Sequence, residues 1–300
     1  MKKTVFITGS TGLLGVSILP KLKKEFNVIQ LSNNSSIKHK NIKYLDYSSK
    51  IKINKFINKY KIPDYFLHIG WGKMTDPLSK YHVKENYLNS KNLLDTFFKR
   101  GLKNFIFIGT IVEYGPQKKP VPEKTKPLKN LRNYEIGKYM FGKYGVKTGK
   151  KMKKTFTHIR MAYLYGPVQK KNSLIYTLHD SYYKKTKFKV SPLNFYRDYM
   201  FSEEAAEGII KIIKKNTKSL VINLGSGKYI YMKDFIKKYW KIIGGKNDNI
   251  VVGKLKNPKN ETKPSKFYMK LNLLKKITGW KPPNNVNKNI KTNIKLCELQ

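Results

Sequence analysis

Cysteine, arginine and acidic residues are scarce in this chain, and no long apolar run occurs. The single cysteine, Cys297, can form neither an intrachain disulfide nor a cysteine-based zinc site, so we expect a cytoplasmic protein without a metal. No apolar run reaches the length of about eighteen residues that a membrane span needs. In the N-terminal stretch "MKKTVFITGSTG", Gly, Ser and Thr end the apolar run within a few residues, so it predicts a first strand instead of a signal peptide.

Acidic residues number 18 against 63 basic ones, which gives a formal net charge of +45. Such a charge is typical of nucleic-acid-binding proteins, but only four of the basic residues are arginine, whose planar guanidinium serves base readout and phosphate clamping. The lysines are spread over the whole chain, as an AT-rich coding bias produces. We therefore expect no nucleic-acid or membrane partner, although the positive field attracts anionic small substrates.

Apolar strand-like segments alternate with helical ones through the first half of the chain. The predicted strands are 4–8, 27–32, 42–46, 64–70, 104–110 and 155–163. The predicted helices are 13–26, which Pro20 should disturb, 49–61, 81–101 and a segment from about residue 133. This alternation predicts an α/β fold with a doubly wound parallel sheet of the Rossmann type.

The alternation weakens after residue 165, which suggests a second, smaller lobe. We predict a dinucleotide-binding Rossmann domain formed by residues 1–165, to which 196–224 return. Residues 166–195 and 225–300 should form a C-terminal substrate-binding lobe. No obvious linker separates the two, so we expect a shared cleft at the carboxyl ends of the strands.

The first predicted strand runs into a glycine-rich turn, "ITGSTGLLG". Glycines here allow a tight turn, close approach of a pyrophosphate and close helix–strand packing, and the following helix offers unpaired N–H groups at its positive end. A glycine-rich turn can be purely structural, but its place between a first strand and a helix favours dinucleotide binding. The predicted cofactor contacts are Gly9, Ser10, Thr11, Gly12, Leu13, Leu14 and Gly15.

The end of the second predicted strand bears on which dinucleotide binds. NAD-binding proteins usually place a carboxylate there to hold the ribose hydroxyls, whereas this chain has Ser32 and Asn33. A hydroxyl or an amide can bond a 2′-phosphate that a carboxylate would repel, so the sequence favours NADP(H) over NAD(H). Asp46, after the third strand, is either an acceptor for the adenine amine or a solvated carboxylate.

A Tyr-x-x-x-Lys pattern occurs six times, starting at Tyr87, Tyr114, Tyr134, Tyr139, Tyr183 and Tyr229. On a helix this spacing puts a phenol and an ammonium on one face, where they can transfer protons. Only Tyr134 begins its helix directly after the loop of the fifth strand, and Thr110 stands 24 residues earlier at the end of that strand. The overlapping Tyr139 is rotated by about 140° around the helix.

Several short motifs fall in an order and spacing that resemble the extended short-chain dehydrogenase/reductases, and more closely their nucleotide-sugar epimerase/dehydratase/reductase branch. The motifs are "TGSTGLLG", "GTIVEYG", "YEIGK", "YLYGP", "FYRDYMFSEEAAEGI", "NLGSGKY" and "ITGWKPP". They cover the chain almost from end to end. The resemblance implies an NAD(P)-dependent enzyme that acts on a nucleotide-diphosphate sugar.

The resemblance also implies roles for the residues that match the family motifs. Tyr134 would be the catalytic acid/base, Lys138 would bind the nicotinamide ribose and lower the Tyr134 pKa, and Thr110 would orient the carbonyl oxygen. Tyr134 and Lys138 thus also count among the cofactor contacts. Asn86, in "ENYLNS", matches a family asparagine near the cofactor; the alternative is a solvated helix residue.

Arg197 opens "RDYMF", where the family places an arginine on the diphosphate of the substrate. A bidentate guanidinium–phosphate contact explains an arginine in a lysine-rich chain. The alternative is an ion pair with one of the nearby carboxylates, Asp198, Glu203 or Glu204. Tyr163 and Asn172 complete the predicted substrate-binding set, Arg160 is expected to be structural, and we expect a homodimer.

Differences between this sequence and the family motifs limit the reactions that it can catalyse. Ile111 and Val112 stand where family dehydratases carry an Asp-Glu pair, and neither can move a proton. Tyr163 stands where C4-epimerases usually carry Asn, and "EYG" resembles the motif of 4-ketoreductases. We therefore predict NADPH-dependent reduction of the C4 keto group of a nucleotide-linked 4-keto-6-deoxy sugar. The alternatives are an NAD-dependent nucleotide-sugar 4-epimerase and a non-catalytic dinucleotide-binding sensor.

Overall fold

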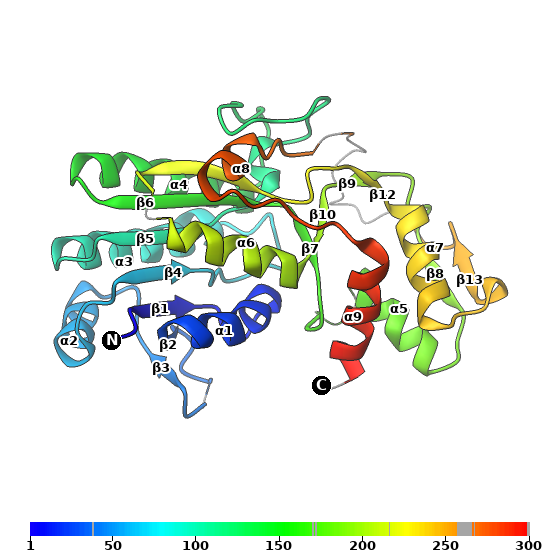
Figure 1. Ribbon diagram of the computed structural model, residues 1–300, viewed down its shortest axis with the longest axis horizontal. Coiled ribbons are helices and arrows are strands. Elements are labelled where there is room, and N and C mark those ends of the chain that lie inside the picture. The colour runs from blue at the N-terminus through cyan, green and yellow to red at the C-terminus, as the bar shows by residue number, and fades with distance from the viewer. Residues whose placement is uncertain are drawn as a thin grey trace.

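A sheet of seven parallel strands forms the centre of the molecule (Figure 1). The computed structural model describes residues 1–37, 39–169, 171, 173–215, 217–256, 266 and 268–298. The strands, in their order across the sheet, are β11 (Leu220–Leu224), β6 (Thr155–Met161), β5 (Asn104–Ile108), β4 (Tyr65–His68), β1 (Thr4–Thr8), β2 (Asn27–Ser32) and β3 (Ile42–Tyr44). Chain order reverses between β1 and β4, and a ligand of such a sheet binds at that point. The predicted Rossmann-type α/β fold is confirmed.

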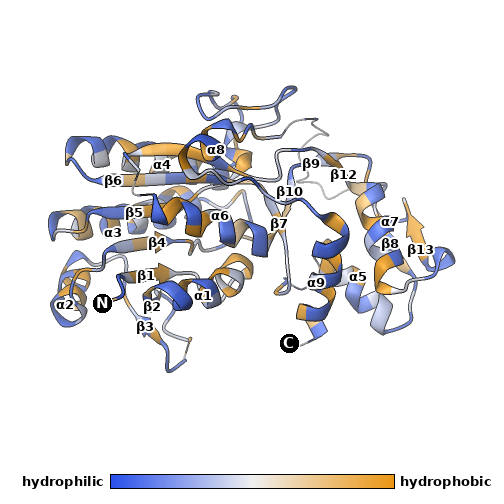
Figure 2. Cartoon of the chain, viewed as in Figure 1, coloured by the Kyte–Doolittle hydropathy of each residue, from blue (hydrophilic) through white to orange (hydrophobic). Residues whose placement is uncertain are grey.

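Helices cover both faces of the sheet (Figure 1). One face carries α1 (Leu13–Glu25) and α6 (Ser202–Lys214), and the other carries α2 (Lys50–Tyr60), α3 (Tyr87–Lys99) and α4 (Asn133–Lys151). Figure 2 shows apolar and polar residues alternating around these helices. Because each helix buries one apolar side against the sheet, the strands lie between two hydrophobic clusters.

A second group of elements lies beyond the carboxyl ends of the strands (Figure 1). It contains α5 (Leu174–Tyr183), α7 (Met232–Ile243) and α9 (Val286–Glu298), packed around a third hydrophobic cluster. Three strand pairs accompany them: β7 (Tyr163–Tyr165) with β10 (Tyr199–Phe201), β8 (Phe188–Val190) with β13 (Ile250–Val252), and β9 (Tyr196–Arg197) with β12 (Ile230–Tyr231). The helix α8 (Asn272–Thr278) packs instead on β11 and α6. The division into lobes at the predicted boundaries stays a proposal.

Two local predictions about helices need correction. The helix α1 continues through Pro20, which is exposed, so water can solvate the backbone carbonyl that the missing proline N–H leaves unbonded. The helix predicted at 81–101 begins with a π-helical turn, His82–Asn86, before α3. Such turns are often found at functional sites, and this one places Asn86 beside the loop after β4. Among the described residues no helix is long and apolar enough to cross a membrane.

Candidate active site

The glycine-rich turn connects β1 to α1 and packs against the segment after β4, at the point where chain order reverses. Gly9 has a φ of 73°, and a Cβ on it would come within 2.7 Å of the Gly70 nitrogen. A Cβ on Gly15 would lie 2.2 Å from the Gly9 carbonyl oxygen, so only glycine lets α1 approach the turn this closely. Ser10 and Leu14 are buried, whereas Thr11 and Gly12 are exposed at the mouth of the turn.

The N-terminus of α1 fits a pyrophosphate. Gly12 is the N-cap, and within the described part of the chain no side chain caps the helix and no acidic residue lies in its first turn. The first-turn N–H groups of α1 therefore have no side-chain cap within the described residues, at the positive end of the helix dipole. A group with two phosphates matches both features, so the turn fits a dinucleotide cofactor.

Ser32, Asn33 and Asp46 lie at the edge of the sheet where the strands β2 and β3 end. The Ser32 hydroxyl oxygen accepts a hydrogen bond from the Asn34 backbone N–H at 3.0 Å, and Asn33 is exposed. Asp46 accepts from the Ser48 backbone and hydroxyl and pairs with Lys52 at 2.9 Å. These hydrogen bonds, those from Ser48 foremost, lower the pKa of Asp46 to about 2. Because its carboxylate already caps a turn, its contact with adenine stays a prediction.

The structure brings together the three residues of the predicted catalytic set. The chain leaves β5 at Ile108, and Thr110 caps a short 3₁₀ helix, Ile111–Tyr114, with its side chain. The Thr110 side chain is also close enough to Tyr134, the second residue of α4, to lower the pKa of its phenol. Lys138, one turn further on, is buried, donates to the Ile108 carbonyl at 2.8 Å and lies 5.4 Å from the Tyr134 ring centroid.

Burial shifts the protonation of both titratable members of this set. It raises the pKa of Tyr134, and the negative charge of Glu113 raises it further, while the nearby Thr110 side chain acts in the opposite direction. The lowering of the Tyr134 pKa expected from Lys138 is therefore not what the structure shows, because burial of the phenol outweighs it. Burial lowers the pKa of Lys138 to about 8, against the favourable charge of Glu113. At neutral pH the phenol is therefore a protonated acid beside an ammonium group, as a proton donor to a developing oxyanion requires.

The overlapping pair is arranged differently. Tyr139 points to the guanidinium of Arg160, 5.8 Å from its ring centroid, and Lys143 is exposed. The rotation expected from the helix period accounts for this separation. Tyr134 thus lies next to Thr110 and Lys138 lies next to the end of β5, whereas Tyr139 and Lys143 point elsewhere.

Asn86 is buried and is not a solvated helix residue. Its side chain accepts from the Gly72 N–H and donates to the Gly72 carbonyl, both at 3.0 Å. This pair of bonds fixes the loop after β4, next to the glycine-rich turn. The contact of Asn86 with a cofactor stays a prediction.

An aromatic layer behind Tyr134 and Lys138 was not predicted. The Trp71 ring lies 5.4 Å from the Lys138 ammonium, and its indole N–H donates to His82 Nδ1 at 3.1 Å. The His82 ring packs edge-on against Tyr134 at 5.3 Å. These rings shield the Lys138 ammonium from water, which agrees with its lowered pKa. The tryptophan in "HIGWG", directly after a strand, was the available signal.

Arg197 and Tyr163 lie together on the side of the second group of elements. The Arg197 guanidinium stacks on Tyr163 at 4.9 Å and on Phe195 at 4.5 Å, and Arg197 donates to the Tyr196 carbonyl. Tyr163 is also close enough to influence the pKa of Tyr134. The arginine therefore lies near the catalytic set. Asn172 lies outside the described residues.

The carboxylates proposed as alternative partners of Arg197 have other partners. Asp198 is buried and accepts from the Ser226 backbone and hydroxyl, both at 2.7 Å. Glu203 pairs with Lys21 at 2.9 Å, and Glu204 accepts from the side chain of Asn289 at 2.8 Å. The phosphate role of Arg197 stays a prediction.

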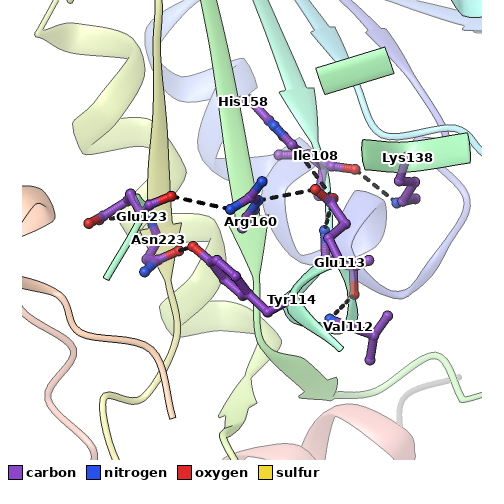
Figure 3. Close-up of polar contacts among 10 residues, drawn as sticks. Ile108, Val112, Glu113, Tyr114, Glu123, Lys138, His158, Arg160 and Asn223 are labelled. Carbon is purple, nitrogen blue, oxygen red and sulfur yellow. Dashed lines mark hydrogen bonds and ion pairs between the residues drawn. The ribbon is translucent and has the colours of Figure 1, made fainter. Parts of the chain in front are cut away.

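Glu113 is an acidic residue of the site to which the sequence analysis assigned no role. It is fully buried, accepts a hydrogen bond from the Thr110 N–H, and pairs with Arg160 and His158, as Figure 3 shows for the two pairs. Arg160, expected to be structural, is therefore held by a carboxylate at the active site. The glutamate of "EYG", which follows two apolar residues that are themselves buried, was the available signal.

Comparison with known proteins decides the family. The sequence profile of the NAD dependent epimerase/dehydratase family matches residues 5–225. The chain belongs to this family. The match confirms the resemblance to the extended short-chain dehydrogenase/reductases, and it makes the protein an NAD(P)-dependent enzyme.

Two curated relatives match most of this family member. ADP-L-glycero-D-manno-heptose-6-epimerase of Brachyspira hyodysenteriae is 24% identical over 260 residues, which cover 79% of this chain and 81% of that protein. CDP-abequose synthase of Salmonella typhimurium is 23% identical over 310 residues, which cover 98% of each chain.

Solved structures share the fold over the full length. UDP-N-acetylglucosamine 4-epimerase from Methanobrevibacter ruminantium M1, in complex with UDP-N-acetylmuramic acid, has a TM-score of 0.84 at 19% identity and covers 100% of both chains. RMD from Pseudomonas aeruginosa, complexed with NADPH, has a TM-score of 0.80 at 17% identity and covers 99% of both chains.

Proposed function

We propose that this enzyme uses NADPH to reduce the C4 keto group of a nucleotide-linked 4-keto-6-deoxy sugar. The proposal rests on the observation that the site has one proton donor, Tyr134, next to Thr110. Ile111 and Val112, which follow Thr110, are buried and apolar, and Glu113 is enclosed by its ion pairs. Within the described residues, no carboxylate beside Thr110 is free to remove a second proton. Elimination needs such a base, whereas reduction of a ketone needs only a hydride and a proton.

The three catalytic residues have complementary parts in this reduction. When bound, the dinucleotide supplies the hydride. As the C4 carbonyl group becomes an alkoxide, Tyr134 donates its phenolic proton to O4 of the sugar. Thr110 orients that oxygen. The resulting phenolate is stabilised by the ammonium group of Lys138, which the Ile108 carbonyl holds in place.

The preference for NADPH rests on Ser32. Its hydroxyl oxygen accepts from the Asn34 N–H, so its own hydrogen can be donated to another acceptor. A 2′-phosphate offers such acceptors and meets no carboxylate from Ser32. The high positive charge of the chain also favours the more anionic dinucleotide.

The substrate class rests on Arg197 and on one relative. A guanidinium stacked between Tyr163 and Phe195 is oriented for bidentate recognition of a diphosphate. The similarity to CDP-abequose synthase extends over 98% of both chains, which supports a nucleotide-linked deoxy sugar as the substrate.

We further propose that the enzyme acts as a cytoplasmic homodimer. The neighbouring helices α3 and α4 expose Leu88 and Met140, by 51% and 37%. Apolar side chains on two packed helices can pair with their own copies about a twofold axis. Light scattering should give twice the chain mass of 35.1 kDa, and a monomer with Leu88→Glu.

The deciding experiment separates a reductase from an epimerase. The purified protein is mixed with NADPH and a panel of nucleotide-linked 4-keto-6-deoxyglucoses, and the absorbance of reduced nicotinamide is followed. We expect a stoichiometric loss of absorbance and little dinucleotide retained through purification. Tightly retained NAD, with interconversion of UDP-hexoses and no added cofactor, would move the protein to the 4-epimerases. Binding of dinucleotide without either reaction would indicate a sensor.

A further inference from the structure

A buried charge cluster formed by Glu113, His158 and Arg160 lies next to Thr110, and Figure 3 shows its side chains. Glu113 Oε1 accepts from the Thr110 N–H at 2.8 Å and lies 3.1 Å from His158 Nε2. Glu113 Oε2 accepts from Arg160 Nε at 3.1 Å. The side chains of Glu113 and His158 are almost fully buried, and that of Arg160 is 5% exposed.

The protonation of this cluster follows from its contacts. A carboxylate only accepts hydrogen bonds, so His158 Nε2 carries the hydrogen that faces Glu113. His158 Nδ1 is buried without a hydrogen-bond partner among the described residues, and a proton there would be unsatisfied. His158 is therefore neutral, and Glu113 and Arg160 form one compensated ion pair.

Two glycines, Gly109 and Gly142, leave the space that the side chains of Glu113 and His158 occupy. A Cβ on Gly109 would lie 2.3 Å from Glu113 Oε1, and one on Gly142 would lie 2.1 Å from the His158 ring. Elsewhere the same region is filled by apolar side chains. A buried ion pair adds little stability relative to apolar residues of similar volume. A contribution to stability is therefore a weak explanation for this cluster.

We propose that Glu113 is a positioning residue of the reaction: its carboxylate, fixed by Arg160 and His158, holds the Thr110 backbone so that the Thr110 hydroxyl faces Tyr134. The inference rests on the proposed function of the site. Two reciprocal hydrogen bonds carry it, because Thr110 donates its N–H to the Glu113 carboxylate and accepts from the Glu113 backbone N–H at 3.2 Å. Together they close the turn that begins at the catalytic hydroxyl.

The Glu113 charge also reaches the proton donor. Charged or titratable groups face Tyr134 from several elements: Glu113, Glu135, Lys138, Tyr163 and His82. Among them Glu113 is the largest charge influence on the Tyr134 pKa, which it raises. The Glu113 charge raises the pKa of Lys138 as well. A neutral side chain at this position should therefore lower both pKa values and move the alkaline limit of activity, which loss of the Lys138 ammonium charge sets first, to lower pH.

The test compares Glu113→Gln with Glu123→Gln. Glutamine keeps the shape and an acceptor for the Thr110 N–H but removes the charge. Glu123 is the matched control, because its carboxylate accepts from the Asn223 N–H on the other side of Arg160. We expect Glu113→Gln to lower kcat about tenfold to a hundredfold with KM for NADPH unchanged, and to shift the alkaline limb of the pH profile to lower pH. Glu123→Gln should change neither.

A second measurement does not depend on the reaction. With ¹⁵N-threonine labelling, the Thr110 amide resonance is assigned by its loss in Thr110→Ser. The charge-assisted hydrogen bond should place it downfield in the native protein, and Glu113→Gln should move it upfield. If the native enzyme reduces no keto sugar, the proposed function fails and this resonance alone decides the positioning role.

The inference would be overturned by a folded Glu113→Gln protein with native kcat, native pH profile and an unmoved Thr110 resonance. If Glu113→Gln does not fold, Glu113→Gln with Arg160→Gln removes both charges together and leaves no uncompensated one. This double variant should show the same loss of kcat, and native turnover by it would equally contradict the proposal.

Discussion

Replacement of the buried lysine should abolish activity without destabilising the protein at pH 7. Lys138 is 4% exposed, and burial lowers its pKa from 10.5 to about 8. At roughly 1.4 kcal/mol for each pKa unit, the charged form costs the folded state ~3 kcal/mol at pH 7. Lys138→Met removes that cost but leaves the Ile108 carbonyl without its donor, which costs about 1 to 3 kcal/mol. The variant should therefore be between equally stable and about 2 kcal/mol more stable at pH 7.

The pH dependence of this difference is the sharper test. Below pH 8 Lys138 is charged in both states and the full cost is present. Above pH 8 the folded protein releases the proton before the unfolded chain does, so the native protein gains stability with rising pH. Between pH 7 and pH 9.5, the advantage of Lys138→Met should shrink by about 2 kcal/mol.

Urea unfolding of the two proteins at both pH values measures this difference. Lys143→Met, at an exposed position of the same helix, is the control and should keep a constant difference from the native protein. Parallel stability curves for the native protein and Lys138→Met would refute the reasoning.

Three further predictions test the site and its support. Tyr134→Phe should lower turnover by about a hundredfold or more with NADPH affinity unchanged, whereas Tyr139→Phe should change turnover little. An inactive Tyr139→Phe variant would show that Tyr134 and Lys138 are not the catalytic pair. The native protein should bind NADPH more tightly than NADH in a fluorescence titration, and Ser32→Asp should narrow or reverse this preference; tighter binding of NADH by the native protein would contradict the cofactor proposal. Gly142→Ala puts a Cβ 2.1 Å from the His158 ring and should lower the free energy of unfolding by about 1 to 3 kcal/mol, so an unchanged urea midpoint would count against the packing described.

The central sheet could be predicted because its signals are local. Strands such as β1 and β5 are short apolar runs between polar turns, and they differ clearly from the helices that follow them. Tyr134 and Lys138 were accessible for the same reason, since a spacing of four residues fixes a common helix face. The short strands after residue 165 carry too few residues to show a period, and β9 has only two.

The role of Glu113 could not be predicted from its neighbours in the chain. Its partners His158 and Arg160 follow 45 and 47 residues later, on a strand that becomes adjacent only when the sheet forms. The same holds for Asp198, whose partner Ser226 lies 28 residues away. The carboxylate of Asp46, in contrast, is satisfied within its own turn.

The sequence by itself determined the alternating fold, the glycine-rich turn and the motifs that mark the family, because each depends on residues within a few positions of one another. Only the tertiary structure decided which carboxylate contacts Thr110 and which side chains enclose Tyr134 and Lys138. Those contacts join β5, β6 and α4, and the burial that shifts the pKa values of Tyr134 and Lys138 exists only when these elements pack together.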